Sequence, residues 1–120
     1  MIVAVNIQGS FVGGGLGRAT AIAVARVEDS QILSWEEIEV RWDLSHDQPG
    51  PARPGEQPSH GAHHARIVSF MKEHEVEAVV TGHAGPPMVH TLGLMGIPIV
   101  QGAAGDARQA ALDAVRLLSE

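Results

Sequence analysis

The fold is decided by the stretch Ile2-Val3-Ala4-Val5-Asn6-Ile7, an almost unbroken apolar run close to the amino terminus. Such a run is typical of a strand that is buried on both faces of a sheet, because a strand wetted on one face alternates between apolar and polar residues. The stretch lacks the basic region and the cleavage site of a signal peptide, so we expect a first strand and a cytoplasmic protein. We place this strand at the centre of the sheet.

Four more strands and three helices are predicted along the chain. The strands are expected at residues 18–27, 31–42, 76–81 and 97–100, where apolar and β-branched residues concentrate. Ser59 is expected to cap a helix that runs to about Glu75, and Pro86 to begin a second helix that ends near Gly96. Asp106 is expected to cap a third helix that runs to the carboxyl terminus.

The predicted order βββαβαβα indicates an α/β fold. Three strands joined by short loops form an antiparallel meander, and strands separated by helices form parallel crossovers. The order matches a ribonuclease H-like, five-stranded mixed sheet, with strand order 3-2-1-4-5 and helices on its faces. Residues 1–120 form a single domain of common size. A flexible loop is expected at residues 43–59, because four prolines interrupt that segment.

The composition excludes several classes of function. With eight basic residues and a formal net charge of −6, the chain is a poor partner for nucleic acid. Its apolar runs are too short to span a bilayer, so no membrane partner is expected. There is no cysteine, which excludes disulfides and thiolate-held clusters. A site for a soft metal must therefore use histidine, methionine or ligands that the cofactor brings.

The predicted topology brings several loops to one end of the sheet. Ligands of open α/β sheets bind at the carboxyl ends of the strands, where the strand order reverses. Here the reversal lies between the first and fourth strands. The loops at this end are the glycine-rich segment 8–17, the proline loop that leads to His60, the turn 82–85 and the segment 101–105. The glycine run at 13–15 has no following Lys-Ser or Lys-Thr, so it is not a phosphate-binding Walker loop.

Histidines concentrate at this same end. His60, His63 and His64 fall in the opening turn of the first predicted helix, at spacings that let imidazoles share one ion. His83 lies in the turn after the fourth strand. We expect these four residues to bind a transition metal ion, and the alternative is that they only pack and hydrogen-bond.

The remaining three histidines are not expected to belong to this site. His74 is expected to be structural and His90 to be exposed on the second helix, whereas His46 has no predicted place. Asn6 and Gln8 stand where a nuclease of this fold class would carry a metal-binding acid, so nuclease chemistry is disfavoured.

The chain resembles the dinitrogenase iron–molybdenum cofactor biosynthesis family. The resemblance rests on the opening strand, on Gly17-Arg18-Ala19, and on the segments 77–85 and 92–100, which are similar to the family's strand, glycine turn, helix and strand. It covers most of the chain outside the proline loop. The family often carries His-Phe-Gly-Arg before its second strand, and here Gly15-Leu16-Gly17-Arg18 stands in that place without the histidine.

The resemblance implies a non-enzymatic protein that carries a metal ion or metal–sulfur cluster, with a cofactor-delivery protein as partner. Arg18, Gly82 and Gly85 are then expected to contact the cofactor. Two alternatives remain open. One is a small metal-dependent hydrolase that uses the same histidines, with Asp43 or Asp47 as its base. The other is an interaction module without a ligand.

Overall fold

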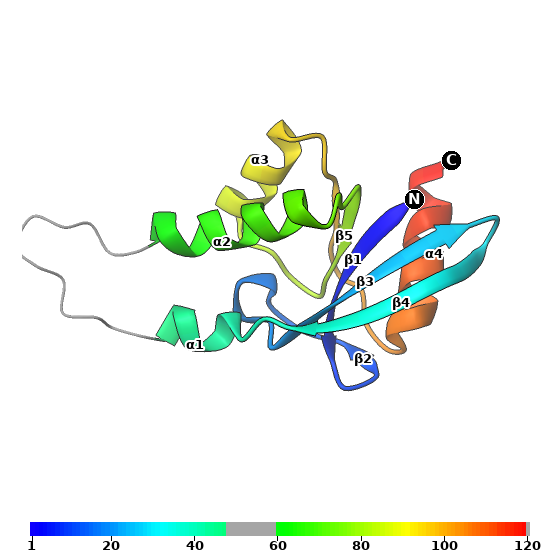
Figure 1. Ribbon diagram of the computed structural model, residues 1–120, viewed down its shortest axis with the longest axis horizontal. Coiled ribbons are helices and arrows are strands. Elements are labelled where there is room, and N and C mark those ends of the chain that lie inside the picture. Colours follow the sequence, from blue (N-terminus) through cyan, green and yellow to red (C-terminus); the bar gives the residue numbers. More distant parts are fainter. Residues whose placement is uncertain (48–59, 120) are drawn as a thin grey trace, which may run out of the picture.

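The computed structural model describes residues 1–47 and 60–119, with the side chains of 1–44 and 64–119. Six strands, four helices and one 3₁₀ turn follow one another along these residues (Figure 1). In chain order they are β1 (Ile2–Gln8), β2 (Phe11–Val12), η1 (Leu16–Arg18), β3 (Ala21–Glu28), β4 (Gln31–Glu39), α1 (Trp42–Asp47), α2 (His60–Glu73), β5 (Ala78–Val80), α3 (Pro86–Leu94), β6 (Ile99–Val100) and α4 (Ala107–Ser119).

The sheet is mixed, and β1 lies inside it. The order is β4-β3-β1-β5-β6, with β2 paired to β1 beside this path. β1 is antiparallel to β3 and parallel to β5. All five residues from Val3 to Ile7 are buried, as the apolar run predicts. The sheet has six strands and not the five expected, because β2 contains two residues and is too short to leave a pattern in the sequence.

Helices cover both faces of the sheet, and the two faces are packed with different side chains. α2 and α3 lie on one face, and α4 lies on the other (Figure 1). Large residues such as Ile67, Met71 and Leu92 fill the first interface. Alanines of α4 fill the second, where they meet Val3 and Val5 of β1. The result is a three-layer α/β/α domain with one thick and one thin apolar layer.

The segment around Trp42 differs from the prediction. A strand was expected up to Trp42 and an irregular loop at 43–59, but β4 ends at Glu39 and residues 42–47 form α1. Arg41 turns the chain with a φ of 50°. The Trp42 ring is 4% exposed and packs edge-on against Phe70, with 5.5 Å between ring centroids. The chain leaves the sheet after Glu39, and Trp42 at the start of α1 is buried against Phe70 of α2 and does not extend β4. The remainder of the predicted loop lies outside the described residues.

Other boundaries move by a few residues. The strand expected from Arg18 begins at Ala21, because residues 16–18 form the 3₁₀ turn η1. The final helix is capped as predicted, since the Gln109 amide donates to Asp106 Oδ2 at 2.9 Å. Within the described residues, no helix combines the length and apolarity needed to cross a membrane.

Candidate functional site

The glycine loop turns back over the end of β1 at very close range. The Gly13 amide donates to the Asn6 carbonyl at 2.8 Å. A Cβ atom at Gly13 would stand 2.5 Å from Asn6 Oδ1, so a side chain at this position would have to displace the buried Asn6 amide. A glycine is therefore required here for packing alone, and it draws the loop tightly over the carboxyl end of the strand.

The same loop is joined to the turn that follows β5. The Gly82 amide donates to the Gly13 carbonyl at 3.0 Å, and the His83 amide donates to the Gly14 carbonyl at 2.7 Å. In return the Leu16 amide donates to the His83 carbonyl at 2.9 Å. These bonds hold two loops that are distant in sequence as one backbone unit. The position of His83 is thus fixed relative to η1.

A pair of buried polar side chains is hydrogen-bonded to this backbone unit. Asn6 and Thr81 are 2% and 0% exposed, and they are the buried polar residues among those described. Asn6 Nδ2 donates to Thr81 Oγ1 at 3.0 Å. The Thr81 hydroxyl lies 3.2 Å from the Gly14 carbonyl and 3.3 Å from that of His83, and it has one proton to donate between them. Sequence reasoning missed this pair; its signal was a polar residue inside an apolar run.

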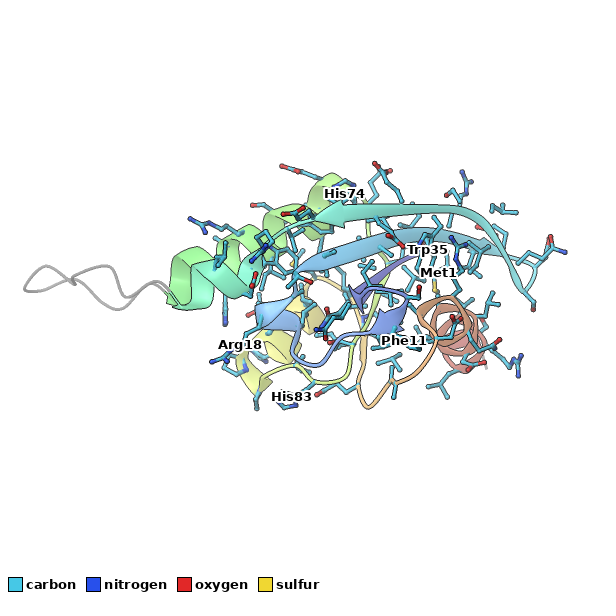
Figure 2. All side chains as sticks on the ribbon, turned by 90° about the horizontal axis from the view of Figure 1, so that it is seen from below. Met1, Phe11, Arg18, Trp35, His74 and His83 are labelled. Atoms are coloured by element: carbon cyan, nitrogen blue, oxygen red, sulfur yellow. The ribbon has the colours of Figure 1, made fainter. Side chains whose placement is uncertain are left out.

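Two of the predicted site residues project from this unit. Arg18, at the end of η1, and His83 both have exposed side chains. Figure 2 shows them directed outward at the same end of the molecule as α3. Among the described residues, no hydrogen bond or ion pair ties the Arg18 guanidinium to another side chain. A guanidinium and an imidazole at one end of the sheet offer one cation and one metal-binding nitrogen.

The two glycines of the turn, Gly82 and Gly85, have structural roles that the sequence did not indicate. A Cβ atom at Gly82 would lie 2.9 Å from the Gly14 carbonyl oxygen, so Gly82 permits the two loops to touch. Gly85 is the N-cap of α3, and Pro86 and Pro87 occupy the next two positions. Prolines have no N–H to donate, so the start of α3 presents fewer donors to an anion than an ordinary helix start. A cofactor contact at Gly82 or Gly85 stays a prediction.

The histidines of α2 are only partly described. His60 and His63 belong to the first turn of α2, but their side chains lie outside the described part of the structure. His64 is half-buried and already takes part in an interaction. Among described side chains, no three His, Asp or Glu residues form a group that could hold a metal ion. The four-histidine site therefore stays a prediction, with His83 as its exposed and fully described member.

The other histidines lie on two different helices. His74 follows α2, and its ring contacts that of Phe70 with 4.4 Å between centroids and a tilt of 42°, which fits a structural role. His90 is exposed on α3. His46 belongs to α1, and its side chain is outside the described set.

Asp43 does not have the properties of a general base. Arg41 Nε and Nη2 contact its two carboxylate oxygens at 3.2 Å each. The hydrogen bond from Arg41 lowers the pKa of Asp43 from its ordinary value. A carboxylate with a lowered pKa accepts a proton less readily, which weakens the hydrolase alternative. Asp47 has no described side chain.

The sequence of the chain matches a known family over nearly its whole length. The family described as "Dinitrogenase iron-molybdenum cofactor" matches residues 1–117. The chain belongs to this family. Among curated proteins, none has a sequence that matches the chain.

Solved structures share the fold at low sequence identity. PH0822 is 20% identical, with a TM-score of 0.69 over 96% of this chain and 89% of that one. The apo form of the orange protein from Desulfovibrio gigas is 22% identical, with a TM-score of 0.66 over 98% and 87%. A Thermotoga protein assigned to the DUF35 family is 19% identical, with a TM-score of 0.62 over 97% and 87%. These likenesses establish the fold, and membership of the family associates the chain with a metal cofactor.

Proposed function

We propose that this protein is a non-enzymatic carrier of a metal–sulfur cofactor or a transition metal ion, held at the end of the sheet beside Arg18 and His83. The observation that supports it most is the backbone unit of residues 13–16 and 81–83, which holds the segments bearing these two exposed side chains together. Family membership supplies the class of cargo. His60, His63 and His64 at the start of α2 are the further ligands we propose.

The described residues fit an anionic cluster better than a lone ion. A structural metal site needs about four protein ligands, whereas an anionic cofactor that carries its own sulfur ligands can also be held by charge-assisted hydrogen bonds. Arg18 provides a positive charge and two parallel N–H donors for an anion, and His83 provides one ligand nitrogen. The lack of cysteine is consistent with a cargo that is held weakly and passed to a delivery partner.

The test is binding of two probes to protein purified without a histidine tag. Calorimetry with Ni²⁺ and, under anaerobic conditions, with tetrathiomolybdate separates an ion site from a site for a molybdenum–sulfur anion. We expect H83A to reduce binding of the effective probe by about tenfold or more, which corresponds to roughly 1.4 kcal/mol. R18Q should weaken the binding of tetrathiomolybdate and leave the binding of Ni²⁺ nearly unchanged, because only the anion is attracted by the guanidinium.

H90A is the matched control, because His90 is exposed on α3 and was not predicted to belong to the site. Equal losses in H83A and H90A would show that binding is a surface effect. If neither probe binds the unaltered protein, the interaction module without a ligand becomes the better description.

A further inference from the structure

A groove of about 490 Å³ lies between the end of β4 and α2, and it shares no residue with the site beside Arg18 and His83. Its floor is apolar, formed by Ile38 and Val40 with the rings of Trp42 and Phe70. Ile38 and Val40 are half-buried, although both belong to the apolar layer beneath α2. This groove therefore leaves part of the apolar layer accessible from outside.

One wall of the groove is the edge of the sheet. β4 is the last strand on its side, and among the described strands it pairs with β3 alone. The Val40 amide donates to the Thr20 carbonyl at 3.0 Å, so the backbone of Val40 points toward β3. Because hydrogen-bonding direction alternates along an antiparallel strand, the N–H and C=O groups of Glu37 and Glu39 point outward. These outward groups can pair with an added strand.

We propose that an extended, basic segment of a partner protein binds here by adding a strand to β4. Side chains of a strand alternate between the two faces of the sheet. Every second residue of the added strand would enter the groove and meet Ile38 and Val40. The residues between them would lie on the other face, beside the side chains of Glu37 and Glu39. A segment that alternates apolar with lysine or arginine residues satisfies both faces.

The charges around the groove favour this occupant over a second copy of the chain. β4 carries exposed Glu36, Glu37 and Glu39, and Glu73 lines the groove from α2. Arg66 also lines it but is already engaged in an interaction of its own. Antiparallel pairing of β4 with β4 of a second copy, centred on Glu37 or Ile38 beside the groove, would place glutamates opposite glutamates, which destabilises cross-strand pairs. A basic segment meets opposite charge instead.

The first experiment is a titration of the full chain with a seven-residue peptide that alternates lysine and valine, followed by NMR. We expect shifts concentrated in 35–40 and in the α2 residues of the groove. A control peptide that alternates glutamate and valine should bind much less. E39K should weaken the basic peptide about tenfold, since an attractive cross-strand charge pair becomes a repulsive one. D113K, which makes the same change of charge on α4, should leave the affinity within about twofold, because Asp113 lies beside residues 100–104 at the opposite edge of the sheet from β4.

A second pair of variants tests the strand pairing itself. E37A removes the charge, whereas E37P also removes the outward N–H without disturbing the bonds to β3. We expect E37P to bind the basic peptide more weakly than E37A, with circular dichroism confirming that both variants are folded. Equal binding by E37A and E37P, or equal weakening by E39K and D113K, would overturn the proposal. A concentration-dependent dimer that E37P dissociates would instead assign the edge to a second copy.

Discussion

Gly82 illustrates how single residues determine the shape of the candidate site. The Cβ atom of an alanine at this position would lie 2.9 Å from the Gly14 carbonyl oxygen and 3.0 Å from that of Gly13. Both neighbours are backbone atoms of a loop that is bonded to β1, so they cannot move aside cheaply. The contact between the two loops thus depends on the absence of a side chain.

We predict that G82A destabilises the protein by about 1–3 kcal/mol, the usual cost of forcing an extra carbon into a filled space. G93A is the matched control: Gly93 lies within α3, and a Cβ atom there would have no heavy atom within 4 Å. That change should stabilise by about 0.5–1 kcal/mol through the higher helix propensity of alanine. Urea unfolding of both variants, with the slopes compared, measures the difference. A neutral G82A would show that the loops can separate without cost.

Residue types predicted part of the site, and contacts between backbones account for the rest. Arg18 and His83 could be assigned to one end of the sheet, because parallel strands bring their carboxyl ends together. The hydrogen bonds that join residues 13–16 to residues 81–83 could not be predicted, since backbone groups leave no signature in a sequence. The bond between Asn6 and Thr81 is hidden for another reason: Asn6 stands out as a polar residue inside an apolar run, but only the pairing of β1 with β5 identifies Thr81 as its partner.

At the scale of elements, the end of α2 shows a conflict between local conformation and residue type. Glu75 has a φ of 54°, in the left-handed region. The Val76 amide donates to the Met71 carbonyl at 2.9 Å and the Glu75 amide to that of Lys72 at 3.2 Å. This pattern is the usual helix end in which glycine occupies the left-handed position. Glutamate is strained there by its Cβ atom.

We predict that E75G raises the free energy of unfolding by about 1 kcal/mol, because glycine removes the left-handed strain. E73G, the same substitution inside the last turn of α2, should lower it by about 0.5–1 kcal/mol, because glycine loses more backbone entropy there. Thermal unfolding by circular dichroism distinguishes the two. Destabilisation by both variants would mean that the Glu75 side chain makes a contact worth more than the strain.

The elements themselves were predictable where periodicity was strong. α3 and α4 begin at the predicted residues, because Pro86 and the capping residue Asp106 mark their starts, whereas the expected cap of α2, Ser59, lies outside the described residues. Residues 42–47 were assigned wrongly: Trp42 was placed at the end of a strand because aromatic residues favour strands, and 43–47 were placed in the loop because prolines follow them. A tertiary contact favours the helix α1: the Trp42 ring packs on that of Phe70, which is distant in sequence.

For the whole molecule, the two sides of the sheet differ in how they are filled. Bulky residues of α2 and α3 pack on one face, whereas α4 packs on the other through Ala107, Ala110, Ala111 and Ala114. Alanine allows the helix to approach the sheet closely. The mixed sheet and its helical layers follow from the order of strands and helices in the sequence. The unequal thickness of the layers follows from side-chain volume, which the pattern of apolar residues does not reveal.

We predict that A111L destabilises the whole domain by about 1–3 kcal/mol, because a larger side chain forces α4 away from β1. Ala111 is fully buried against a cluster that includes Val3 and Val5, so the added carbons have no free space. Q109L, which places leucine on the exposed side of the same helix, is the control. It removes only the exposed hydrogen bond from Gln109 to Asp113, so the free energy of unfolding should stay within about 0.5 kcal/mol of that of the unaltered protein.

Chemical unfolding of A111L, followed by both circular dichroism and tryptophan fluorescence, shows how far the destabilisation spreads. Trp35 reports on the α4 face, where the Arg108 guanidinium lies 4.6 Å from the centre of its ring. Buried Trp42 reports on the opposite face, beneath α2. If both signals change together, at a lower urea concentration than in the unaltered protein, packing of α4 stabilises the entire domain. We expect this result for a domain of this size. Loss of the α4 signal alone would show instead that α4 unfolds as a separate unit.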